Sequence, residues 1–190
     1  MSILEIINEL GKKAKHASIK IRVLQKENKK IAYEYLEKNI EKNAGIILCA
    51  NKLDIENAIT KNLSKPLINR LKITEESISG IIKSIAEIKN QPDPIGTILE
   101  NWEQPNGLKF SKISVPLGVL GVIYESRPNV TIDASCLALK SNNALILRGG
   151  SDSYHTSKQL VNIITESFKK VDLPDNIIQM IPTTDREAVD

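Results

Sequence analysis

The stretch PLGVLGVIYESRPNVTIDASCLALKSNNALILRGGS, residues 116–151, decides the fold. It contains two apolar runs, GVLGVIYE (118–125) and ALILRG (144–149). Continuous runs of this length are typical of strands that are covered on both faces of a sheet. The residues between them, 130–141, predict a helix. A strand, a helix and a second strand in this order predict a right-handed crossover between parallel strands.

The same alternation continues downstream. Residues 152–170 predict a long helix, and NIIQMIP (176–182) predicts a third strand. A further helix is expected to begin in TTDREAV (183–189). The predicted fold class is therefore α/β, with a βαβαβ unit that makes up about half of a doubly wound, Rossmann-like parallel sheet. We expect the last strand to be an unprotected edge and the domain to be incomplete. The helix predicted over 152–170 should bury one side, which consists of Leu160, Ile163, Ile164, Ser167 and Phe168.

The chain upstream of the sheet is predicted to be helical. Segments 2–16, 26–42 and 44–62 carry helical patterns. The clearest helix begins at Thr74, a candidate N-cap, and Pro92 and Pro94 end it. Its apolar stripe consists of Ile78, Ile81, Ile82, Ile85 and Ile88.

A hairpin is predicted between the helices and the sheet. The turn signal is Pro105-Asn106-Gly107, because Asn and Gly both tolerate a positive φ. We therefore divide the chain into a helical region (1–94), a hairpin that could serve in oligomerisation (95–115) and an incomplete nucleotide-binding unit (116–190).

Composition narrows the class of protein. The chain has 190 residues, of which 41% are hydrophobic and 26% charged, as in ordinary globular proteins. No apolar run approaches the roughly 18 residues that a membrane span needs, and the N-terminus lacks a signal-peptide pattern. The net charge of +3 comes from lysines scattered among glutamates. We therefore expect a cytoplasmic protein with neither a nucleic-acid nor a membrane partner.

The first candidate site follows the second apolar run. Arg148, Gly149, Gly150 and Ser151 would form a turn between a strand and a helix. Glycines let a backbone approach a ligand, the helix N-terminus would offer free N–H groups to a phosphate, and Arg148 could add a charged contact. The alternative is a plain turn with an arginine in solvent.

The second candidate site follows the first apolar run, in Tyr124-Glu125-Ser126-Arg127-Pro128-Asn129. Pro128 favours an extended Arg127. Asn129 could donate its side-chain amide to a developing oxyanion. It could also cap the following helix, or do both.

The remaining candidates are weaker. His16 and His155 are expected at the surface. Cys49 and Cys136 are expected in the core rather than as nucleophiles, and two cysteines are too few for a disulfide framework. No spacing of Cys and His predicts a metal site.

The motifs IYESRPNVTIDA, LKSNNALILRGGS and TTDREAV together resemble the N-terminal part of the gamma-glutamyl phosphate reductases, of the aldehyde dehydrogenase superfamily. The resemblance implies NADPH-dependent reduction of L-glutamyl 5-phosphate to L-glutamate 5-semialdehyde with release of phosphate, in proline biosynthesis. A cysteine thiolate would displace the phosphate, and hydride would reduce the resulting thioester.

The resemblance also implies roles for residues of the two candidate loops. Asn129 matches the oxyanion donor, with Arg127 as a competitor for that role. Arg148 matches the basic residue that holds the adenosine ribose or its phosphate, and Gly149, Gly150 and Ser151 follow as the turn. Glu125, Ser126 and Arg127 would lie along the NADP(H) site.

Two departures from the family stand out. Asn142 occupies a position where the family usually has glycine, and asparagine tolerates the left-handed conformation expected there. The family's chains are also about twice as long. We therefore expect this chain to be an N-terminal half that is inactive alone, with its nucleophilic cysteine beyond Asp190.

The implied partners are the missing C-terminal half, a second copy of the chain and, functionally, glutamate 5-kinase. Two rival hypotheses remain, a non-catalytic assembly module and a superfamily dehydrogenase that acts on a free aldehyde.

Overall fold

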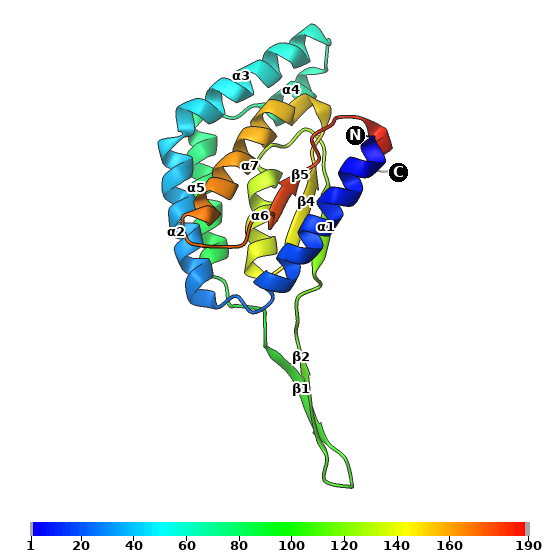
Figure 1. Ribbon diagram of the computed structural model, residues 1–190. Helices are drawn as coiled ribbons and strands as arrows, with labels where there is room; N and C mark the ends of the chain where they lie inside the picture. The colour runs from blue at the N-terminus through cyan, green and yellow to red at the C-terminus, as the bar shows by residue number, and fades with distance from the viewer. Residues whose placement is uncertain (1, 189–190) are drawn as a thin grey trace.

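The computed structural model describes residues 2–188 and places a helical region, a hairpin and a three-stranded sheet in chain order (Figure 1). Among these residues no helix combines the length and apolarity needed to cross a bilayer. The helices before the hairpin are α1 (Ile3–Ile21), α2 (Lys26–Lys42), α3 (Ala44–Thr60), α4 (Lys65–Leu71) and α5 (Glu75–Asn90).

α5 confirms the helix that the isoleucine stripe predicts. It begins with a capping box, in which Thr74 Oγ1 accepts from the Ser77 amide (3.2 Å) and Ser77 Oγ accepts from the Thr74 amide (3.0 Å). The whole stripe is buried except for the half-buried Ile82. Local sequence therefore decides both the start and the buried face of this helix.

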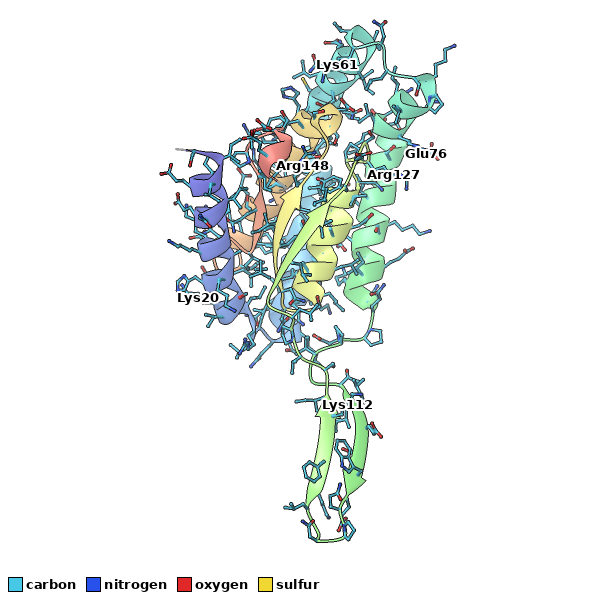
Figure 2. The ribbon with its side chains drawn as sticks, turned by 90° about the vertical axis from the view of Figure 1, so that its right-hand side faces the viewer. Lys20, Lys61, Glu76, Lys112, Arg127 and Arg148 are labelled. Carbon is cyan, nitrogen blue, oxygen red and sulfur yellow. The ribbon has the colours of Figure 1, made fainter. Side chains whose placement is uncertain are left out.

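The sheet has the predicted parallel topology, in the order β3 (Val119–Ile123), β4 (Ala144–Arg148) and β5 (Ile178–Met180). The crossovers are α6 (Val130–Lys140) and α7 (Tyr154–Lys169), which pack on one face. α1 covers the other face, as the two views show (Figures 1 and 2). The sheet thus has helices on both faces, as in a doubly wound fold.

The exposed edge of the sheet differs from the sequence-based expectation. β5 lies at an edge, but its Ile178 and Gln179 are buried, and Gln179 Nε2 donates to the Leu10 carbonyl of α1 (3.1 Å). The prediction that the last strand is unprotected is therefore wrong. The open edge is β3, where Ile123 is 63% exposed, so the prediction that this first strand is covered on both faces is also wrong.

The turn between α6 and β4 confirms the expectation for Asn142. This residue has φ +52°, in the left-handed region. Its side chain adds contacts that glycine could not make, because Nδ2 donates to the carbonyls of Arg22 (3.1 Å) and Leu24 (3.0 Å). Asn142 therefore ties the α6–β4 turn to the connection between α1 and α2.

The hairpin of β1 (Ile98–Glu103) and β2 (Lys109–Ile113) extends away from the body of the molecule (Figures 1 and 2). Its turn lies at Pro105-Asn106-Gly107, as predicted. Gly107 has φ +82° and its amide donates to the Gln104 carbonyl (2.9 Å), but Asn106 does not share the positive φ. Pro105 occupies the first central position of the turn, where its ring fixes a negative φ.

The root of the hairpin is held by two lysines that bind helix ends. Lys29 Nζ donates to the Lys140 carbonyl at the end of α6 (2.9 Å) and pairs with Asp93 Oδ2 (2.6 Å). Lys140 Nζ donates in turn to the carbonyls of Lys89 (3.0 Å) and Gln91 (2.6 Å) at the end of α5. Positive charge at a helix C-terminus is stabilising. Asp93, between α5 and β1, is thereby anchored to α2 and α6.

Candidate functional site

The two loops that the sequence singles out meet at the carboxyl ends of β3 and β4. Figure 2 shows Arg127 and Arg148 at the same end of the sheet. A Cβ on Gly149 would lie 3.0 Å from the Tyr124 hydroxyl, and one on Gly150 would lie 3.4 Å from the Ser126 amide. The glycines thus allow the two loops to pack together. Protein atoms fill the space that we expected a ligand to approach.

The loop after β3 holds an unusual backbone conformation. Ser126 is buried with φ +45°, a region that side chains other than those of Gly, Asn and Asp seldom adopt. Glu125 and Arg127, on either side of it, are exposed. Strain of this kind is concentrated at functional sites, where the surrounding structure enforces it. Below the loop, the hydroxyls of Tyr124 and Thr131 are hydrogen-bonded at 2.6 Å.

Asn129 stands at the start of α6 with its side chain exposed and making no capping hydrogen bond. The first amides of the helix are bonded to its own preceding backbone, Val130 to the Arg127 carbonyl (3.1 Å) and Thr131 to the Pro128 carbonyl (3.0 Å). The alternative that the Asn129 side chain caps the helix is therefore wrong. Its amide group is available to donate to a ligand.

Arg148 joins the turn after β4 to the segment after β5. Its Nη1 donates to the Gly149 carbonyl (3.2 Å) and its Nη2 to the Thr184 carbonyl (3.0 Å), while Nε is buried without a partner. A buried N–H without an acceptor is costly. The guanidinium is thus held in place by the carbonyls of Gly149 and Thr184.

The start of α7 differs from the expectation of free N–H groups. Asp54 of α3 is buried here, and its two carboxylate oxygens accept from the amides of His155 (3.1 Å) and Thr156 (2.8 Å). The Thr156 hydroxyl adds a third bond at 2.6 Å. Asp54 therefore caps α7 from a distant helix and occupies the place where a phosphate was expected.

Sequence patterns do not reveal that Asn51, close to Asp54, also binds the start of α7. Asn51, one turn earlier on α3, donates to Thr156 Oγ1 (3.2 Å) and to the Leu71 carbonyl (2.8 Å). The only local signal was a pair of polar residues three apart in the apolar stretch IILCANKLDI. That signal does not say which helix the pair contacts.

Ser151 is exposed at the beginning of the turn after Gly150, next to Asp152. Asp152 Oδ1 lies 3.7 Å from Lys61 Nζ, so a lysine from the end of α3 partly neutralises the nearest carboxylate. Figure 2 shows Lys61 reaching this end of the molecule. The turn thus has positive charge from Arg148 and Lys61, negative charge from Asp152 and Asp54, and a neutral hydroxyl from Ser151.

The cysteines and histidines divide into buried and exposed groups. Cys136 is fully buried, and burial raises the pKa of its thiol far above the ordinary value, so it cannot act as a thiolate. Cys49 is exposed on α3, and the expectation that it lies in the core is wrong. His16 and His155 are exposed, as predicted. Within residues 2–188, His, Cys, Asp and Glu side chains form no group of three that could hold a metal.

Solved structures define the class of protein to which this arrangement corresponds. The chain superposes on a probable aldehyde dehydrogenase from Listeria monocytogenes with a TM-score of 0.72 at 14% identity, covering 98% of this chain and 39% of that one. The fold is therefore that of one portion of an aldehyde dehydrogenase. No protein-family model matches the chain.

The chain is more similar to several reductases of one kind. A gamma-glutamyl phosphate reductase from Bartonella bacilliformis is 48% identical over 180 residues, which are 95% of this chain and 44% of the relative. The reductase from Clostridium tetani is 44% identical over 184 residues, 97% of this chain and 43% of the relative. The crystal structure of the Thermotoga maritima reductase gives a TM-score of 0.92 at 34% identity, over 96% of this chain and 44% of that one.

The chain is thus a homologue of the N-terminal portion of the gamma-glutamyl phosphate reductases, and the predicted resemblance is confirmed. It spans less than half the length of the relatives that it matches.

Proposed function

We propose that this chain supplies the cofactor-binding and oxyanion-binding part of a gamma-glutamyl phosphate reductase. The reaction would be reduction of L-glutamyl 5-phosphate by NADPH to L-glutamate 5-semialdehyde and phosphate, and a glutamate 5-kinase would supply the substrate. The observation that carries the proposal is the free side-chain amide of Asn129, one loop away from the Arg148 turn. The proposal is supported by the 48% sequence identity with a named reductase over 95% of this chain.

The residues at the strand ends fit NADP(H) at its adenosine end. Arg148 and the exposed Ser151 would bind the 2′-phosphate, with Lys61 nearby. The cofactor's pyrophosphate would not use the α7 amides that Asp54 binds. Glu125, Ser126 and Arg127 would contact the cofactor along the neighbouring loop. When bound, NADPH supplies the hydride that reduces the acyl carbon.

Asn129 would act on the acyl oxygen. A thiolate attacks the acyl carbon, negative charge develops on this oxygen, and inorganic phosphate leaves as the thioester forms. The Asn129 amide would donate to the oxygen at that stage, and again when hydride adds and the aldehyde is released from the thiolate. Because Cys136 is buried, we assign the thiolate to the part of the reductases outside the matched 44%.

The test is an activity assay on this chain joined to the remaining C-terminal portion of the Bartonella bacilliformis relative. We expect oxidation of NADPH that depends on enzymatically generated L-glutamyl 5-phosphate, and no turnover by the chain alone. Cys136→Ser should leave the activity of the joined protein unchanged. A well-folded joined protein without activity, or turnover by the single chain that disappears in Cys136→Ser, would contradict the proposal.

We also propose that the hairpin pairs with a second copy of the chain. Its strands expose apolar residues to solvent far from the body, which isolated two-stranded hairpins rarely tolerate. Sedimentation of the chain and of a double variant, Trp102→Ser with Phe110→Ser, tests this. A concentration-independent monomer in both cases would contradict it. The exposed residues include Ile98, Leu99, Trp102, Phe110 and Ile113.

A further inference from the structure

A groove of about 370 Å³ lies beside Asn129, between the start of α6 and the α4–α5 connection. It is separate from the turn at Arg148, and the cofactor assignment does not use it. Its lining includes Arg70, Lys72, Gly80, Ser84, Asn129 and Asp133.

The groove contains charges of both signs. Arg70 and Lys72 are exposed, and neither forms an ion pair within the part of the chain that the structure describes. Asp133 is half-buried and accepts a hydrogen bond from Ser84 Oγ (2.8 Å). Two cations and one positioned carboxylate complement a small molecule that itself carries both charges.

The carboxylate lies in register with the oxyanion donor. Asp133 is one turn beyond Asn129 on α6, and its amide donates to the Asn129 carbonyl (3.1 Å). Residues four apart share one face of a helix. A ligand that reaches the Asn129 amide with one end therefore has Asp133 beside it.

Gly80 leaves the floor of the groove open. It lies within α5, and glycine inside a helix destabilises the helix relative to alanine. A Cβ at this position would nevertheless meet no protein atom within 4 Å. Packing within the chain therefore does not require a glycine at this position. Gly80 is one of the residues that line the groove, so a side chain at this position would reduce the space there.

We propose that this groove binds the α-amino-carboxylate end of the substrate, which rests on the proposed function. Arg70 and Lys72 bind the α-carboxylate, and Asp133, held by Ser84, accepts from the α-ammonium group. The acyl group then lies at Asn129. The groove thus selects an acyl phosphate of an α-amino acid over a simple aldehyde or acyl phosphate.

The first experiment measures ligand binding to the chain through its backbone amide chemical shifts in NMR. L-Glutamine is the main probe, because it has the α-ammonium and α-carboxylate groups and no second negative charge. We expect it to shift the resonances of residues around Arg70, Gly80 and Asp133. Glutarate, which lacks the ammonium group, should bind at least about fivefold more weakly, and inorganic phosphate should not produce these shifts.

Matched variants assign the effect to the groove. Gly80→Ala should raise the melting temperature by about 2 °C and weaken L-glutamine binding about tenfold. Gly11→Ala, at another open position inside a helix, should stabilise similarly and leave binding unchanged. Arg70→Gln combined with Lys72→Gln should weaken binding about fivefold, whereas Lys65→Gln on α4 should not.

Asp133→Asn should abolish the preference for L-glutamine over glutarate. Absence of groove shifts with L-glutamine, or equal weakening by Gly80→Ala and Gly11→Ala, would overturn the proposal. Phosphate shifts that depend on Arg70 and Lys72 would also overturn it, because the cations would then hold the phosphoryl end. NADPH binding at Arg148, measured separately, tests the proposed function, so the two failures are distinguishable.

Discussion

The two helices that follow strands of the sheet begin in different ways. At α6 the first amides are bonded to the adjacent backbone carbonyls of Arg127 and Pro128, and the Asn129 side chain is left free. At α7 the first amides are bonded to Asp54, a residue about one hundred positions earlier in the chain. Neither helix offers its amides to a phosphate. Anion binding at this edge of the sheet therefore depends on side chains.

Under the proposed function, this one sheet edge would serve two purposes. The start of α6 presents a neutral amide donor, which suits a charge that develops only during reaction. The start of α7 is closed by a fixed negative charge and bordered by Arg148, Ser151 and Lys61. In the proposed reaction the phosphate ester would lie at the turn beside Arg148, and the reacting acyl group would lie at Asn129.

The largest expected effect concerns Asn129. In the joined protein Asn129→Ala should lower kcat by about 10²–10³-fold, because one oxyanion donor is removed and no helix cap is lost. Asn57→Ala, an exposed asparagine on α3, should have no effect. Steady-state kinetics and a urea melt of the single chain provide the check. A loss of stability comparable with the loss of rate would mean that Asn129 is structural.

The next effect concerns the start of α7. Asp54→Ala should cost about 2–3 kcal/mol of unfolding free energy, because two amides and a hydroxyl lose a charged acceptor inside the protein. Asp54→Asn should cost less, since its amide oxygen can still accept. Asp152→Ala, at a partly exposed pair beside the same helix, should change the stability by less than about 1 kcal/mol. Urea unfolding measures all three, and equal losses would contradict a buried cap.

The same contrast shows what the sequence could predict. The strands, α5 with its isoleucine stripe, and the left-handed Asn142 follow from local patterns, and the structure has all of them. Both candidate loops were located because parallel topology places the ends of strands at one edge. Local patterns report a residue's own element and its buried face.

Contacts between distant elements could not be found in this way. Nothing near Asp54 indicates α7, and nothing near Lys61 indicates Asp152. The burial of β5 depends on α1, whose Leu10 carbonyl accepts a hydrogen bond from Gln179. Sequence patterns alone therefore predict an exposed β5, which the structure does not have. These errors share one cause, the docking of the helical region on the sheet.

Cofactor choice gives a smaller expected effect at the α7 side. In the joined protein Ser151→Glu should lower kcat/KM for NADPH relative to NADH by about 1–2 kcal/mol, because a carboxylate would lie beside the 2′-phosphate at an exposed position. Ser151→Gln, of similar size without charge, should largely retain the ratio. Equal losses for the two cofactors in Ser151→Glu would place Ser151 away from the 2′-phosphate.

The smallest effect concerns the far end of α6, where Lys29 binds the Lys140 carbonyl and pairs with Asp93. Burial alone would raise the pKa of Asp93, but the hydrogen bonds from Lys29 and the Ile95 amide and the charges of Lys29 and Lys140 hold this pKa below its ordinary value of 3.8. A carboxyl whose pKa is lower in the folded than in the unfolded state stabilises the fold above the unfolded pKa. That stability is lost as the pH falls through the folded pKa.

Asp93→Asn should therefore lower stability by about 1 kcal/mol at neutral pH, because Asp93 is partly exposed and Lys29 keeps a carbonyl acceptor. The difference between the two proteins should narrow below about pH 4 as Asp93 itself becomes protonated. Melting temperatures between pH 7 and pH 3 measure this, with Asp175→Asn, at an exposed pair with Lys169, as the control. A difference that stays constant with pH would show that the anchor at the end of α6 depends on hydrogen-bond geometry and not on the charge of Asp93.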